Sequence, residues 1–220
     1  MKWLLALYLV VLLSGCAVAT VQSYTDPVYR DGPQLKQVVV SAAGMPIHQR
    51  LKAEQAMAES IVKAGGGALK ASDLLPPTRN FTEAEVAQIL KESGADGVVI
   101  LSLVQQGSES TYVPQTQLPG SSTSYVSVFG NQATVQTYHR PGQTVGGFVV
   151  AKPVGAYKAT VFEAGTGKTI WMADGSASGN AWANHDLLAI TVANEVVAKL
   201  IGERIVSGKL PPTTEPPRFK

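Results

Sequence analysis

The chain of 220 residues contains one cysteine, Cys16, and little charge. A disulfide within the chain is therefore excluded, and once Cys16 is modified no thiol remains for catalysis or for a metal. Charged residues make up 15% of the chain and the formal net charge is +2. A nucleic-acid-binding surface needs a concentrated basic face, so the composition gives no indication of a nucleic-acid partner.

The first apolar run, from Trp3 to Leu13, is too short to span a bilayer as a stable helix. It follows a single positive charge at Lys2 and leads into small residues, which is the organisation of a secretory signal peptide. We therefore expect residues 1–15 to be removed from the mature protein.

The end of this signal, "LSGC" at residues 13–16, resembles the lipobox of bacterial lipoproteins, in which the cysteine is acylated and becomes the new amino terminus. The resemblance implies a membrane anchor at Cys16, made stable by several acyl chains. Because Ala17 and not aspartate follows the cysteine, it also implies the periplasmic face of the outer membrane. An ordinary secretory signal, cleaved later at "AVAT", is the alternative.

Apolar periodicity predicts one α/β (α+β) domain over residues 35–206, between a tether at 16–34 and a disordered proline-rich tail at 207–220. Strands are expected at 35–42 and 95–104, a third around 68–77, and a hairpin at 155–180. Helices are expected at 45–65, 80–94 and 180–206. The fold class is a single small mixed sheet packed by about three helices, with a β-hairpin insertion.

The helices carry local signals of different kinds. In the helix at 80–94, Thr82 and Glu85 can form a capping box and Gly94 can end it. The other two are identified by apolar residues at core spacing, and Asn184 can cap the last of them, ahead of His185. The expected core positions are Ile47, Leu51, Ala58, Ile61 and Val62 in one, and Leu188, Val192, Val196, Leu200 and Ile201 in the other.

Residues 105–147 form an insertion rich in Ser, Thr, Gln, Gly and Tyr, with almost no charge. Such a length is unusual inside a compact domain, so the segment is either functional or partly disordered. "SYVSVFG" and "ATVQTYH" alternate well enough to make a hairpin. We expect Tyr112, Tyr125 and Tyr138 to form a partner contact surface; alternatively, these tyrosines only cover the sheet.

The sequence "AGTGK" at residues 164–168 looks at first like a phosphate-binding loop. Such a loop needs a glycine five positions before Gly167, but that position is Phe162. It also needs a helix after Lys168, but the residues there are typical of a strand. The segment is therefore predicted to be a hairpin turn with Gly165 or Gly167 at positive φ. No nucleotide is expected to bind.

No other pattern indicates catalysis. "GSASG" at 175–179 has Ala177 where a nucleophile elbow needs serine. The histidines His48, His139 and His185 are far apart in sequence and lack metal-ligand spacing. We therefore expect no catalytic residues, no metal and no cofactor, and a protein that is not an enzyme.

The order of elements, with "LKQVVVSA", "FTEAEVAQILKESGADGVVILSLV" and "YKATVFEAGTGKTIW", resembles the small α/β domain in the amino-terminal part of TolB. The same domain occurs in the lipoproteins CsgG and PelC and in lipoprotein activators of penicillin-binding proteins. The resemblance implies a non-enzymatic accessory or docking module of a cell-envelope assembly. The alternative is a subunit of an oligomeric secretion or export ring; a periplasmic enzyme is the third possibility.

Overall fold

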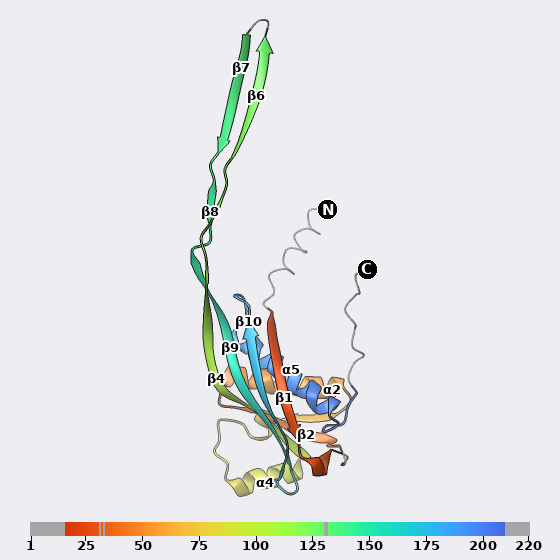
Figure 1. Cartoon of the computed structure of the whole chain (residues 1–220). Coiled ribbons are helices and arrows are strands. Elements are labelled where there is room, and N and C mark those ends of the chain that lie inside the picture. The colour runs from red at the N-terminus through yellow and green to blue at the C-terminus, as the bar shows by residue number, and fades with distance from the viewer. Residues whose placement is uncertain (1–15, 31, 33, 130–131, 210–220) are drawn as a thin grey trace. The chain divides into compact units, whose positions relative to one another are not determined.

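The computed structural model describes residues 16–30, 32, 34–129 and 132–209, with backbone alone at 126–129 and 132–135 (Figure 1). The chain forms two compact units. Unit 2 is residues 109–151, and unit 1 is the remainder of the described chain. The expected signal peptide at 1–15 and residues 210–220 of the expected tail lie outside the described residues.

Unit 1 is built on a six-stranded mixed sheet in the order β1-β10-β9-β4-β2-β3. Strand β2 pairs in parallel with β3 and β4, while β10 pairs antiparallel with β1 and β9. The expected α/β class with one mixed sheet is therefore confirmed. The strands are β1 (Ala17–Thr25), β2 (Gln37–Ala43), β3 (Gly67–Lys70), β4 (Gly97–Val113), β9 (Phe148–Glu163) and β10 (Thr169–Gly179).

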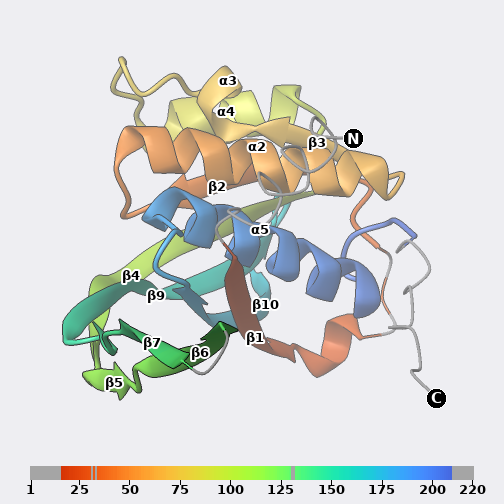
Figure 2. The same ribbon diagram turned by 90° about the horizontal axis from the view of Figure 1, so that it is seen from above.

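The α-helices of unit 1 are α2 (Ile47–Lys63), α3 (Ala71–Leu74), α4 (Glu83–Glu92) and α5 (His185–Gly202), and a short 3-10 turn, η1, spans Pro27–Tyr29. Helices α2 and α5 lie side by side (Figure 2), joined by a hydrogen bond from Ser60 Oγ to Asn194 Oδ1 of 2.7 Å. The segment expected as a strand at 68–77 is a strand only to Lys70 and continues as α3. Helix α4 has the expected capping box at Thr82 and Glu85, and Gly94 follows it with φ of 67°.

The core lies between the sheet and helices α2 and α5. All five expected core positions of α5 are buried, and each such side chain contributes about 1.5–3 kcal/mol by leaving water. In α2 the prediction is confirmed at Ile61, and Ala58 packs partly buried against the core, but the prediction is wrong at Ile47, Leu51 and Val62, which are exposed. The buried stripe of α2 is Gln49, Ala53, Glu54, Met57 and Ile61.

The polar residue Glu54 can lie in the buried stripe of α2 because both oxygens of its carboxylate accept hydrogen bonds. It accepts hydrogen bonds from the backbone N–H of Ala42 at 3.1 Å and of Ser72 at 3.0 Å. It also accepts from Arg50 Nε at 3.0 Å and is itself 0% exposed. A buried charge is tolerated where it is paired and hydrogen-bonded. One side chain thus joins β2, α2 and α3.

The expected tether at 16–34 is wrong for most of its length. Residues Ala17–Thr25 form the edge strand β1, which pairs with β10 from Ala17 opposite Gly179 to Thr25 opposite Trp171. Val21 and Thr25 are buried within the unit. Small and polar residues hide the alternation of this strand in the sequence, because only Val21 among its inward residues is strongly apolar. The folded unit therefore begins at residue 17 and not at 35.

Unit 2 contains two short antiparallel ladders. Strands β6 (Ser121–Phe129) and β7 (Gln132–Arg140) pair over nine residues, and β5 (Thr116–Leu118) pairs with β8 (Gln143–Val145) over three. The expected hairpin of "SYVSVFG" and "ATVQTYH" is thus confirmed. The only charged residues between 109 and 151, counting His as neutral, are Glu109 and Arg140.

The segment "AGTGK" connects β9 to β10 as a hairpin turn. Glu163 N–H donates to the carbonyl of Lys168 at 2.9 Å, and Gly167 N–H donates to the carbonyl of Glu163 at 2.8 Å. Gly167 has φ of 69°, a conformation that favours glycine. The prediction of a turn is confirmed, because the strand β10 begins at Thr169 where a phosphate-binding loop needs a helix.

Candidate functional site

Cys16 lies exposed at the beginning of the sheet, directly before β1. Its backbone carbonyl accepts a hydrogen bond of 2.9 Å from the N–H of Asn180, the residue that follows β10. The ladder between β1 and β10 therefore extends to Cys16 itself. Any group attached to Cys16 is held against the folded unit with no intervening linker.

An exposed tryptophan, Trp182, lies in the loop that begins at Asn180. Its side chain is 71% exposed, and its backbone N–H donates to Asn180 Oδ1 at 3.0 Å. Asn180 thus contacts both Cys16 and Trp182 and brings them to the same end of the sheet. The apolar pattern placed Trp182 in the final helix, so its exposure was missed. The available signal was Asn184, a helix cap that leaves Trp182 outside the helix.

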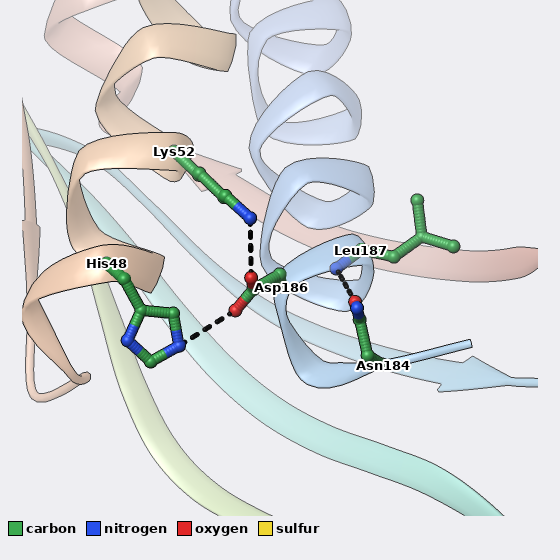
Figure 3. Close-up of polar contacts among 5 residues, drawn as sticks. All are labelled: His48, Lys52, Asn184, Asp186 and Leu187. Carbon is green, nitrogen blue, oxygen red and sulfur yellow. Dashed lines mark hydrogen bonds and ion pairs between the residues drawn. The ribbon is translucent and has the colours of Figure 1, made fainter.

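The loop leads into α5, whose first turn is fixed by polar contacts (Figure 3). Asn184 caps the helix by accepting from the N–H of Leu187 at 2.9 Å, as the sequence indicated. Asp186 pairs with Lys52 Nζ at 2.6 Å and with His48 Nε2 at 3.1 Å, both on α2. The Asp186 side chain is 18% exposed, against 60% for His48. These pairs hold the start of α5 against α2.

A groove of about 390 Å³ opens on unit 1 beside Cys16. Its lining includes Val18 and Thr20 of β1, Ser176 and Ser178 of β10, and Gln105 of β4. None of the lining residues is charged: Val18, Thr20, Gln105, Gly107, Val154, Gly155, Ala156, Ser176, Ala177 and Ser178. Hydroxyl and amide groups of this kind can donate and accept hydrogen bonds. The surface next to Cys16 is therefore neutral.

The other end of β1 is fixed by Glu203, directly after α5. Its carboxylate accepts hydrogen bonds from Thr25 Oγ1 at 2.8 Å, from Trp171 Nε1 at 2.9 Å and from Ser23 Oγ. Burial acts to raise the pKa of Glu203, but these hydrogen bonds and the charge of Lys199 outweigh it and hold the pKa below its ordinary value. Glu203 thus stabilises the position of β1 as a structural acceptor.

The three tyrosines proposed as a contact surface are all exposed, at 60% for Tyr112, 61% for Tyr125 and 62% for Tyr138. The structure brings Tyr125 and Tyr138 together across the β6–β7 ladder, with ring centroids 6.0 Å apart in an edge-to-face arrangement. Tyr112 lies on β4. No ring contact joins it to the other two among the residues that the structure describes. The proposed surface is therefore a pair of rings plus a separate tyrosine.

Within the described ranges, no three His, Cys, Asp or Glu side chains come close enough to hold a metal ion together. The same part of the chain contains no helix that is long and apolar enough to cross a membrane. Tyr157, in the core, is 2% exposed, and this burial raises its pKa to about 12.

No protein-family model matches the chain, and no curated protein matches it. Among solved structures, it is similar to the PelC dodecamer from Paraburkholderia phytofirmans, with 14% identity, 86% of this chain and 99% of that chain covered, and a TM-score of 0.46. An L103M form of that dodecamer shows 15% identity, coverage of 86% and 100%, and a TM-score of 0.48.

A third similar structure is the lipoprotein GNA1162 from Neisseria meningitidis, with 13% identity, coverage of 76% of this chain and 98% of that chain, and a TM-score of 0.40. Likenesses of this size do not assign the chain to a family.

Proposed function

We propose that this protein is a lipoprotein of the outer membrane, anchored through acyl chains on Cys16, and that it serves as a non-enzymatic docking module of a cell-envelope assembly on the periplasmic face. The observation that carries the proposal is the position of Cys16. The lipobox-like sequence ends at the first residue of the β1–β10 ladder, so the acylated residue would hold the folded unit directly at the bilayer surface.

The surroundings of Cys16 support this placement. Trp182 is exposed beside it, and tryptophan is enriched at the boundary between lipid and water because its ring is apolar and its N–H is polar. The adjacent groove carries no charged side chain. Bringing this end of unit 1 to a membrane therefore requires no ionised side chain from the groove to lose its hydration.

The docking role rests on unit 2. A two-stranded ladder exposes both of its faces, and Tyr125 and Tyr138 present aromatic rings there at low conformational cost. Tyrosine is enriched at the energetic centres of protein interfaces. We assign unit 2 as the contact surface for an envelope protein.

Growth with a labelled fatty acid tests the anchor. We expect label on the full-length protein and none on Cys16→Ser, with the variant released from the membrane fraction. Trp182→Ser is the matched control: it should keep the label, because the acyl group is attached to Cys16 and the lipobox is unchanged. Label that persists on Cys16→Ser would contradict the proposal.

One observation favours the second candidate, a subunit of an oligomeric export ring. Among the described residues, the ladder of β6 and β7 has no third strand, so each of its strands leaves one backbone edge open to another copy. Light scattering of the detergent-extracted protein separates the two candidates. A monomer or dimer supports the docking module, and a mass of many copies supports the ring.

A further inference from the structure

The outer edge of β1 is the longest open backbone edge of unit 1. In the ladder with β10, Asn180 N–H donates to the carbonyl of Cys16, and Asp26 N–H donates to the carbonyl of Ile170. Residues of an antiparallel strand alternate between bonding to one neighbour and pointing away from it. The even-numbered residues of β1 therefore bond to β10, and the N–H and C=O groups of Ala17, Ala19, Val21 and Ser23 point outward.

Nothing described in the chain covers these outward groups with a hydrogen bond. β1 is the terminal strand of the sheet order, and the backbone bonds of the residues that flank it, Cys16 and Asp26, go to Asn180 and Ile170 on the side of β10. Proteins usually protect such an edge with charge or proline. Residues 17–25 read "AVATVQSYT" and contain neither. The edge is therefore able to accept another strand.

We propose that β1 is a docking edge for an extended, uncharged segment of another envelope protein, which adds to the sheet as a seventh strand. The proposal rests on the proposed function, because it takes Cys16 as the membrane anchor. Strand addition supplies affinity through backbone hydrogen bonds and specificity through alternate side chains.

The position of the anchor argues against the β1 strand of a second copy on the edge. Twofold antiparallel pairing of two β1 strands over their full length would place the two Cys16 residues about 30 Å apart along the strands, at about 3.4 Å per residue. Both anchors could not then lie at one bilayer surface. Twofold parallel pairing would set identical residues at the same height, with donors facing donors. An unrelated strand meets neither obstacle.

Helix α5 shapes the space beside this edge. It begins next to Asn180 and ends at Glu203, which bonds to Ser23 and Thr25, so it runs in the direction of β1. Its contacts with α2 come from Asp186 and Asn194. The flank turned away from α2 therefore carries Thr191, Glu195 and Lys199, all half-buried.

This flank gives the added strand a defined chemistry. Nearer Cys16 it would meet Thr191, which favours an apolar or hydroxyl side chain. Towards Thr25 it would meet Glu195 and Lys199, which favour a polar one. On the other face, Val18 and Tyr24 are 69% and 57% exposed and can contact alternate side chains of the same strand.

Amide hydrogen exchange on the full-length protein tests the proposal. The protein is extracted from its own envelope in mild detergent together with what it binds, and is compared with the purified chain alone. We expect the amides of Ala19, Val21 and Ser23 to exchange quickly in the chain alone and at least about tenfold more slowly in the extracted assembly. Those of Thr20 and Gln22 should be slow in both, because they bond to β10.

A pair of proline variants provides the matched control. Ala19→Pro removes an outward N–H and should leave the melting temperature nearly unchanged while abolishing the protection of Val21 and Ser23. Thr20→Pro removes a bond to β10 and should lower the melting temperature by several degrees.

Three results would overturn the proposal. The first is fast exchange of the outward amides in the extracted assembly, and the second is protection that survives Ala19→Pro. The third is protection in an assembly that contains only copies of this chain, which would mean that a second copy binds at the outer edge of β1. Failure of the anchor is scored separately by the fatty-acid label on Cys16, so the two proposals fail in distinguishable ways.

Discussion

In unit 1, the buried carboxylate of Glu54 and the half-buried carboxylate of Glu203 each have several partners, whereas unit 2 exposes both faces of two-stranded ladders and has almost no charge. In unit 1, Glu54 accepts three hydrogen bonds and Glu203 accepts three more. In unit 2, the side-chain hydrogen bonds among the described residues are exposed, such as the bond between Ser124 and Thr137. Unit 1 is therefore stabilised by contacts within its own fold. A two-stranded ladder such as that of unit 2 is only marginally stable in water by itself.

Glu54→Ala should have the largest effect on unit 1. The substitution leaves Arg50 and the N–H groups of Ala42 and Ser72 without their acceptor in a buried site, so the free energy of unfolding should fall by about 3 kcal/mol. Urea unfolding followed by the fluorescence of buried Trp171 measures it. The matched control is Glu59→Ala on the same helix, whose side chain is 52% exposed and whose loss should cost less than about 0.5 kcal/mol.

Glu203→Gln should have the next largest effect, with a dependence on pH. The folded pKa of Glu203 lies below its unfolded value, so its contribution is complete above the unfolded pKa and is lost as pH falls through the folded pKa. At pH 7 the free energy of unfolding of the variant should be about 1 kcal/mol below that of the wild type. Between pH 5 and pH 3 the free energy of unfolding should decrease less in the variant than in the wild type. Unfolding curves of both proteins over this range measure the difference. If the free energies of unfolding of the two proteins differ by the same amount at all pH values, the role given to the carboxylate is contradicted.

Asp186→Asn should cost less, about 0.5 kcal/mol, because His48 and Lys52 are both more than half exposed and such pairs are weak in water. The loss should shrink as salt is added, since salt screens exposed charges. Thermal melts of wild type and variant at low and high salt make the comparison. Equal losses in both would show that packing at the start of α5, and not charge, is responsible.

Replacing residues 109–151 by a short glycine-containing turn should have the smallest effect on unit 1, within about 0.5 kcal/mol. The reason is that no core residue of unit 1 comes from that segment. Binding of the envelope protein that unit 2 contacts should be lost at the same time. Tyr125→Ala with Tyr138→Ala serves as the milder variant, with weakened binding and unchanged unfolding. If the replacement unfolds unit 1, the stability of unit 1 depends on unit 2 and the two units do not fold independently.

Local signals in the sequence were sufficient where one residue decides the conformation. The capping box at Thr82, the cap at Asn184 and the turn at Gly167 are all as predicted, because each satisfies backbone groups within a few residues. The core face of α5 was predictable for a related reason, since its apolar residues form a single stripe.

The prediction from sequence failed where the local sequence fits two arrangements equally well. Helix α2 has apolar residues on two stripes, and contacts from β2 and α3 select the one that contains Glu54. Strand β1 has too few apolar residues to show its alternation, and it exists because β10 offers an edge. At the candidate site, the sequence supplied Cys16 alone, because Asn180 and Trp182 meet it only through that pairing.

The sequence by itself determined the class of fold, the capped helices, the turn between β9 and β10 and the hairpin within residues 124–139, because periodicity and turn chemistry are local. Only the tertiary structure decided that residues 17–25 belong to the sheet and that Cys16 lies beside Trp182. It also decided that a glutamate belongs in the core. These features depend on hydrogen bonds between segments more than a hundred residues apart or on partners from several elements, and no local pattern records such partners.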